Sequence, residues 1–143
     1  MLQEFGQLLH TYLTSHIILA KTILPLIAER EGSSYLIITG GVGEKIFVPD
    51  AAPLTVAIAA LYSAVKVLQF EWQEKPVRVN EFRIFVRVVH DEEADLAAQP
   101  MPLHPTGDFG RIIAGIGLAS NVRGQTVTCN FNEYKDVLAK YAV

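Results

Sequence analysis

Strand-like and helix-like segments alternate along this 143-residue chain, and the alternation limits its possible folds more than any other feature. The run Tyr35–Thr39 is apolar without alternation, which is typical of a parallel strand covered on both faces. From Val77 to Val89 the residues alternate as in a long strand. Between these segments, apolar residues recur every three or four positions, as on one face of a helix. The expected elements are helix 5–28, strand 35–39, helix 53–74, strand 77–89, loop 90–107, a helix from Asp108, strand 125–131 and helix 132–141.

Strands that alternate with helices imply right-handed crossovers, which place helices on both faces of a parallel sheet. We therefore expect one α/β domain over residues 1–143, built as a three-layer unit of about three parallel strands with flanking helices. Pro25 should bend the end of the first helix, and Asp108 can cap the start of the third. Residues 90–107 are rich in acids and prolines, which predicts an exposed loop.

The composition excludes several classes of protein. The chain has 12 Lys and Arg against 15 Asp and Glu, so no positive field attracts nucleic acid. The uncharged, apolar stretch Ala51–Val65 falls short of the ~20 apolar residues of a membrane span. Cys129 is the only cysteine and the start lacks a basic signal region, which favours a reducing, cytoplasmic location. Apolar residues make up 50% and charged residues 19%, an excess of apolar surface for a monomer.

Several short motifs occur in the order found in short-chain dehydrogenases/reductases, and the chain resembles the carboxyl-terminal half of that fold. The Val-Arg-Val-Asn phrase before a strand and the Arg-Gly-Gln phrase before the last strand are the more specific motifs. The resemblance covers nearly all of this chain and implies a truncated Rossmann-like unit. The matching segments are Leu24–Pro25, Leu36–Gly40, the helix after Pro53, Val77–Asn80 and Arg123–Gln125.

The region of resemblance includes neither the family's nucleotide-binding site nor side chains that match its catalytic residues. These enzymes hold NAD(P) on a glycine-rich turn in the half that precedes the matched region, so no cofactor is expected here unless that half is supplied. The resembled enzymes share an Asn, a Ser and a Tyr-x-x-x-Lys pair as catalytic residues, and the Lys lowers the pKa of the Tyr. Counted back from Val77–Asn80, the Tyr falls at Leu54 or Thr55, the Lys at Ile58 or Ala59, the Ser in Gly40–Val42 and the Asn near Tyr12. None of these side chains can perform the proton transfer, so the active-site positions are degenerate.

A second alignment supplies a Tyr-x-x-x-Lys pair directly. Tyr62 and Lys66 lie one helical turn apart, as the family's pair does. This alignment shortens the following helix by about two turns and finds no serine at the matching upstream spacing. The competing interpretation is that both are ordinary residues in the middle of a helix.

The remaining candidates favour structural roles. The loop Thr39–Lys45 has glycines, but Glu44 stands where a dinucleotide turn needs glycine and would repel a pyrophosphate. The four histidines show no metal-ligand spacing, so neither a cofactor-binding nor a metal-binding residue is predicted. Arg83 and Arg87 share a strand face that could hold an anion, although a solvated or ion-paired face is the preferred interpretation. Cys129 is expected to be a buried apolar residue.

These observations lead to two main hypotheses, besides a third in which the chain is a carrier that uses an apolar cleft left by the absent strands. In the first, the chain is an inactive dehydrogenase-like module that self-associates, as a homodimer or higher oligomer, through helices 5–28 and 53–74, which pack between subunits in the resembled family. In the second, it is half of an NAD(P)-dependent oxidoreductase that needs a nucleotide-binding partner chain. Both place strand 35–39 at an open sheet edge, which must be covered.

Overall fold

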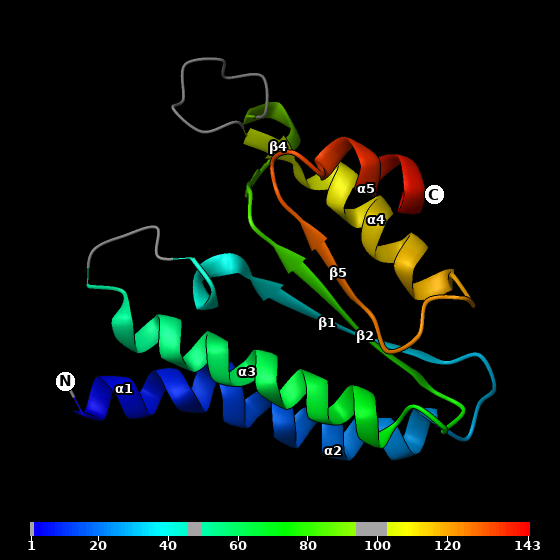
Figure 1. Cartoon of the computed structure of the whole chain (residues 1–143), viewed down its shortest axis with the longest axis horizontal. Helices are drawn as coiled ribbons and strands as arrows, with labels where there is room; N and C mark the ends of the chain where they lie inside the picture. Colours follow the sequence, from blue (N-terminus) through cyan, green and yellow to red (C-terminus); the bar gives the residue numbers. More distant parts are fainter. Residues whose placement is uncertain (1, 46–49, 94–102) are drawn as a thin grey trace.

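The computed structural model describes residues 2–45, 50–93 and 103–143, and it has three layers (Figure 1). The middle layer is a parallel sheet of β1 (Ser34–Gly40), β2 (Arg78–Ile84) and β5 (Thr126–Cys129), in the order β1-β2-β5. The α/β class and the three parallel strands in sequence order are thus confirmed. Both β1 and β5 lie at edges of this sheet within the described residues.

One face of the sheet is covered by the amino-terminal helices and by α3 (Ala52–Glu71). The predicted single helix 5–28 is instead α1 (Leu2–Leu9), a π-helical turn η1 (His10–Thr14) and α2 (Ser15–Ile27). Pro25 lies inside α2, whose helical assignment continues to Ile27. The two helices and the sheet share a core of Ala20, Leu24, Ile37, Leu61, Val65, Leu68, Val77 and Val79.

The opposite face is covered by α4 (Thr106–Leu118) and α5 (Tyr134–Tyr141) (Figure 1). Its core comprises Phe82, Phe109, Ile112, Ile116, Val122, Val127, Cys129, Val137 and Tyr141. The two helices approach closely at Gly115, where an added Cβ would lie 1.5 Å from the carbonyl oxygen of Tyr141. Only a residue without a side chain fits at that position.

The expected strand 77–89 is wrong as one element. The sheet partners of β2 run out together, because Gly40 pairs with Ile84 at the end of β1 and the Phe85 N–H bonds to Cys129, the last residue of β5. The chain then leaves the sheet. β3 (Arg87–Val89) pairs instead with β4 (Leu103–Pro105) in a second, two-stranded parallel sheet.

The expected exposed loop 90–107 is also wrong in part, and residues 94–102 lie outside the described residues. The segment contains the short 3-10 helix η3 (Asp91–Glu93), strand β4 and the start of α4, and His104 is buried. Asp108 does not cap α4, which begins two residues earlier. Asp91 does so from a distance, since its carboxylate accepts hydrogen bonds from Thr106 Oγ1 (2.9 Å) and Gly107 N (2.8 Å).

By length and composition alone, helix α3 is long and apolar enough to cross a membrane. One third of that 18-residue window is buried in the fold. Its buried residues include Leu61, Val65 and Leu68, which pack with the sheet. The rest of the helix remains accessible, with Val56, Val67 and Phe70 each more than half exposed.

Candidate functional site

The carboxyl ends of parallel strands are the usual ligand-binding edge of an open α/β sheet, and a cavity lies there in this chain. It has a volume of about 260 Å³ and is lined by Gly40–Val42 and Ile84–Arg87. Gly40 ends β1 and Ile84 ends β2, so the sheet itself positions both walls. Most of the lining is apolar, with Arg87 as its one charged member.

The glycines at this edge are required for packing. An added Cβ on Gly41 would lie 2.2 Å from a ring carbon of Phe85, and one on Gly43 would lie 2.8 Å from the backbone nitrogen of Ala59. The turn η2 (Gly41–Gly43) therefore fits directly against the first half of α3.

The same turn does not fit a pyrophosphate. The N–H groups of Glu44 and Lys45 both donate to Gly41 O at 3.0 Å, so they are not available to phosphate oxygens. The Glu44 carboxylate adds a negative charge beside them, paired with Arg83 at 3.3 Å. These two N–H groups and the carboxylate therefore do not favour phosphate binding at this turn.

The positions expected to hold the catalytic groups do come together. Gly40–Val42, the expected Ser position, lies against the first half of α3, which carries the Tyr and Lys positions of the first alignment. Tyr12, near the expected Asn position, lies in the π-helical turn that packs against α3. The hydroxyl of Thr55 is buried and has no hydrogen-bond partner among the residues described. That these positions correspond to the catalytic positions of the resembled family stays a prediction. The equivalent positions on α3 are Leu54 or Thr55 and Ile58 or Ala59.

Tyr62 and Lys66 face different surroundings. Tyr62 is buried, its hydroxyl donates to the Gly40 carbonyl, and the Arg83 guanidinium lies 3.6 Å from its ring centroid. Burial raises the pKa of Tyr62, against a lowering influence of Arg83, whereas a catalytic tyrosine needs a lowered pKa. Lys66 is exposed and lines another cavity with Arg123. Their catalytic role stays a prediction that this environment does not favour.

A buried charge network beside Tyr62 was not anticipated from the sequence. Glu81 is fully buried in the central strand and accepts hydrogen bonds from Arg83 Nε (3.1 Å) and Nη2 (2.8 Å). Two hydroxyls complete its shell, Thr39 at 2.6 Å and Thr126 at 3.0 Å. Arg83 is therefore ion-paired, as preferred from the sequence. The available signal was an acid directly after Val77–Asn80, in a strand that is covered on both faces.

Cys129 is buried at the end of β5, as expected. Burial raises the pKa of its thiol to about 11, which keeps it protonated near neutral pH. A protonated, buried thiol is a poor nucleophile. Among the described residues, no group of three or more His, Cys, Asp and Glu side chains is arranged to hold a metal ion.

No protein-family model matches the sequence, and no curated protein matches it significantly. Solved structures do match the fold. The NADPH-bound short-chain oxidoreductase with an atypical catalytic centre from Pseudomonas aeruginosa PAO1 has a TM-score of 0.73 at 18% identity, with 88% of this chain and 55% of that chain covered. Acetoin dehydrogenase from Enterobacter cloacae gives 0.73 at 15% identity, covering 90% and 55%.

A short-chain dehydrogenase/reductase of unknown function from Caenorhabditis elegans gives a TM-score of 0.72 at 14% identity, again covering 90% of this chain and 55% of that one. This chain thus spans about half the length of the structures that it matches. Together with the strand order and the helices on both faces, these matches define the architecture. The chain has about half of the short-chain dehydrogenase/reductase fold.

Proposed function

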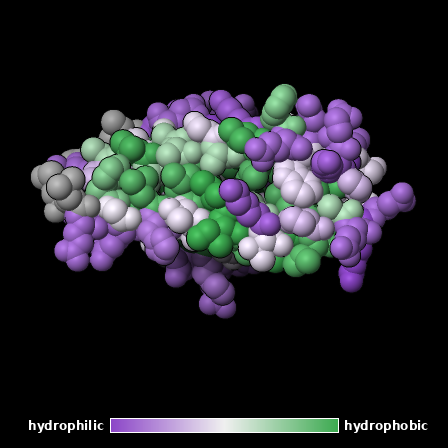
Figure 2. Space-filling model, turned by 90° about the horizontal axis from the view of Figure 1, so that it is seen from below, coloured by the Kyte–Doolittle hydropathy of each residue, from purple (hydrophilic) through white to green (hydrophobic). Residues whose placement is uncertain are grey.

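We propose that this chain is a non-catalytic, self-associating module with a dehydrogenase-like fold. The observation that carries the proposal is an apolar band on the outer face of α2 and α3 (Figure 2). Contiguous exposed apolar surface of this kind marks interaction sites in folded domains. The band consists of side chains that are each more than half exposed: Ile18, Leu19, Leu26, Val56, Val67 and Phe70.

A second copy is the proposed occupant of this band. Along α3, Val56, Val67 and Phe70 recur at helical spacing on one stripe, so α3 can offer its length to a neighbouring helix. The core side of α2 and α3 is already filled by the sheet, which leaves this outer stripe for an intermolecular contact. A helix-to-helix interface would bury the apolar excess noted in the composition.

Charge substitution in the band tests the self-association. We expect Val67→Glu and Leu19→Glu each to raise the dimer dissociation constant about 100-fold, because a carboxylate would be buried without a partner. Sedimentation equilibrium over a range of concentrations measures this. Leu118→Glu is the matched control, since Leu118 is 73% exposed but lies on α4. A wild-type chain that stays monomeric, or a control that dissociates equally, contradicts the proposal.

The absence of a usable nucleotide turn in the described loop gives a second expectation. Titration with NADPH should give no saturable heat at ligand concentrations of about 1 mM. Calorimetry is the suitable method, because Trp72 lies at the far end of α3, about 30 Å along the helix from Ala52. Micromolar binding would overturn the non-catalytic assignment.

A second candidate function rests on the open edge of β1. Within the described residues β1 pairs only with β2, and Ile38 on it is 47% exposed. A parallel strand from a nucleotide-binding half would cover this edge and supply NAD(P), with Tyr62 and Lys66 as the catalytic pair. An in-frame glycine-rich strand–turn–helix directly upstream of the Met1 codon would support this function. Unchanged turnover of a reconstituted enzyme after Tyr62→Phe would exclude the tyrosine from it.

We also place the chain in the cytoplasm. The single cysteine, Cys129, is free and buried, which suits a reducing compartment. The net charge of −3 supports an assignment without nucleic-acid partners.

A further inference from the structure

We propose that the small sheet β3–β4 is held on the main fold by an acid-sensitive latch, formed by His104 and the rings of Phe109, Phe131 and Tyr134. Protonation of His104 releases β4 from α4 and α5. This inference does not depend on the proposed self-association, because the apolar band on α2 and α3 lies on the other side of the main sheet. The features that carry it are a buried imidazole without a hydrogen-bond acceptor and the small size of the sheet to which it belongs.

The His104 ring is enclosed by aromatic side chains from three segments. Its centroid lies 4.0 Å from that of Tyr134 in α5, 6.5 Å from that of Phe109 in α4 and 6.4 Å from that of Phe131, which follows β5. The residue is 7% exposed, and its Nε2 atom has no hydrogen-bond partner among the residues described. An imidazolium carries a hydrogen on both ring nitrogens. A protonated His104 would therefore bury a donor without an acceptor, which disfavours the closed latch.

The sheet that carries His104 can open by itself. β3 and β4 pair over three residues each, with Val88 opposite His104, and within the described ranges neither strand pairs with the main sheet. Phe109 also packs on Phe82 of β2, with ring centroids 6.0 Å apart, so it stays anchored when β4 leaves. A short element with few partners opens at a lower free energy than the whole domain.

The nearest charged group compensates only in part for a proton on His104. Burial lowers the pKa of His104, and the Asp108 carboxylate of α4 opposes this with a smaller effect. That carboxylate is already shared, because it accepts hydrogen bonds from Arg111 at 2.6 Å and from the Tyr134 hydroxyl. Burial and the bond to Asp108 raise the pKa of Tyr134, so its hydroxyl stays neutral in acid.

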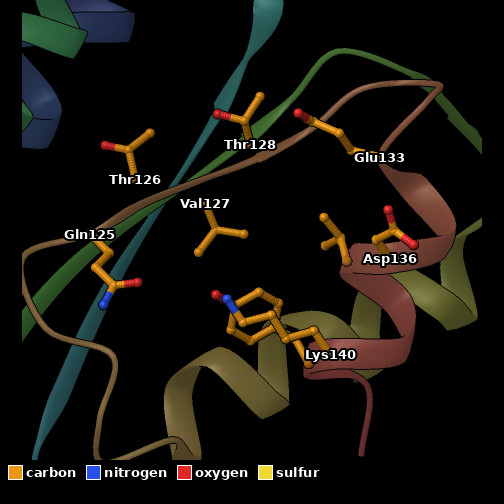
Figure 3. Close-up of a pocket in the computed structure, with 9 residues that line it drawn as sticks. Gln125, Thr126, Val127, Thr128, Glu133, Asp136 and Lys140 are labelled. Atoms are coloured by element: carbon orange, nitrogen blue, oxygen red, sulfur yellow. The ribbon is translucent and has the colours of Figure 1, made fainter.

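The other charged groups around α5 do not contact the ring. Glu133, Asp136 and Lys140 line a separate cavity of about 390 Å³ beside β5, which neither His104 nor Tyr134 lines (Figure 3). Lys135 is exposed. Tyr134 is therefore the side chain through which α5 meets the buried histidine.

The groups on the side of β3 and η3 do not open the latch in mild acid. Arg87 of β3 and the three acids of η3 are exposed. Hydrogen bonds lower the pKa of both Asp91, which caps α4, and Asp108. Their contributions to stability are therefore present above a pH of about 4 and are lost only below it. The exposed His90 attracts the Asp91 carboxylate, so a proton on His90 favours the closed segment.

The pH range of opening follows from His104. A histidine exposed to water has a pKa of about 6.5, so the released β4 takes up a proton below that pH, whereas the closed latch resists it. The open state then binds more protons than the closed state. The closed latch is consequently most stable above a pH of about 6.5 and loses stability as the pH falls below this value.

Hydrogen–deuterium exchange of the full chain at about pH 7.5 and about pH 5, corrected for the intrinsic exchange rates, tests the latch. We expect the opening constant of residues 103–107 to rise by about threefold to about 30-fold at the lower pH, with the upper limit set by the roughly 1.5 pH units below the usual histidine pKa. Residues 78–84 of β2 should change by less than about twofold. A smaller rise at β4, or an equal rise in β2, overturns the proposal.

Histidine variants make the test specific. His104→Phe keeps an aromatic ring and removes the titratable group, so its opening constant should agree within about twofold at the two pH values. His90→Gln is the matched control, because His90 is an exposed histidine outside the latch, and it should keep the wild-type response. A His104→Phe chain that still responds to pH, or a control that no longer does, contradicts the proposal.

Nuclear magnetic resonance of the wild-type chain decides the question if His104→Phe does not fold. The Cε1–H signal of His104 should stay at its neutral position at a pH of about 6.5, where an exposed histidine is half protonated. It should titrate only at lower pH, together with the exchange of residues 103–107. A midpoint at or above a pH of about 6.5 would show that the closed latch accepts the proton, which overturns the inference.

Discussion

Replacement of Arg83 by methionine is expected to lower the free energy of unfolding by about 3–5 kcal/mol, because it strands the Glu81 carboxylate in the core. Glu81 has no exposed surface, and Arg83 supplies two of its four hydrogen bonds. The hydroxyls of Thr39 and Thr126 cannot neutralise its charge. Urea denaturation followed by circular dichroism measures the loss.

Two further variants make the interpretation specific. Arg87→Met removes an exposed arginine from β3 and should change stability by less than about 0.5 kcal/mol. Glu81→Gln combined with Arg83→Met should recover part of the loss, since the charge left without a partner is gone. A loss below about 1 kcal/mol in Arg83→Met would mean that Glu81 is hydrated in solution, contrary to its burial.

Replacement of Gly115 by alanine is the second large expected effect, with a loss of about 3 kcal/mol. The new Cβ would lie 1.5 Å from the Tyr141 carbonyl oxygen, which is backbone and cannot rotate away. Helix α5 would therefore have to move off α4, and the buried contacts of Val137 and Tyr141 would loosen. The same urea titration reports it.

Gly110 in the same helix provides the control. An added Cβ there meets nothing within 4 Å, so Gly110→Ala should stabilise the protein by roughly 0.5–1 kcal/mol through a smaller loss of backbone freedom. The two alanine variants are thus expected to differ in sign. Equal effects would show that α4 and α5 do not approach each other as closely as the structure has them.

The sequence predicted the parts of the fold that depend on local periodicity. The apolar run 35–39 and the three-residue and four-residue spacings around it identified β1 and its neighbouring helices, because burial of one face dictates those patterns. It did not predict where β2 ends. Apolar alternation continues to Val89, and the end is set by two partner strands, each more than forty residues away in the chain.

The site shows the same division. A count of residues along one chain assigned the family's Tyr and Lys positions to α3 and its Ser position to Gly40–Val42, and this assignment stays a prediction. The pairing of Glu81 with Arg83, Thr39 and Thr126 joins three strands, and no periodic pattern reports which polar groups meet across a sheet. The sequence did not predict the cap of α4 by Asp91 for the same reason, since the carboxylate lies fifteen residues from Thr106 in the chain.

The π-helical turn at His10–Thr14 bears on how relatives of this chain could differ in length. Ser15 N–H bonds to His10 O, five residues back, so this turn holds about one residue more than an α-helical turn. A single-residue insertion in an ordinary helix rotates everything beyond it by about 100°, which would turn a buried stripe toward solvent. Here the extra residue is absorbed within one turn, and Ala20 and Leu24 still reach the core. A homologue one residue shorter in this turn could therefore keep both flanking helices in the same place. Its sequence alignment with this chain would contain a one-residue gap, although the helices on both sides of the gap would still superpose.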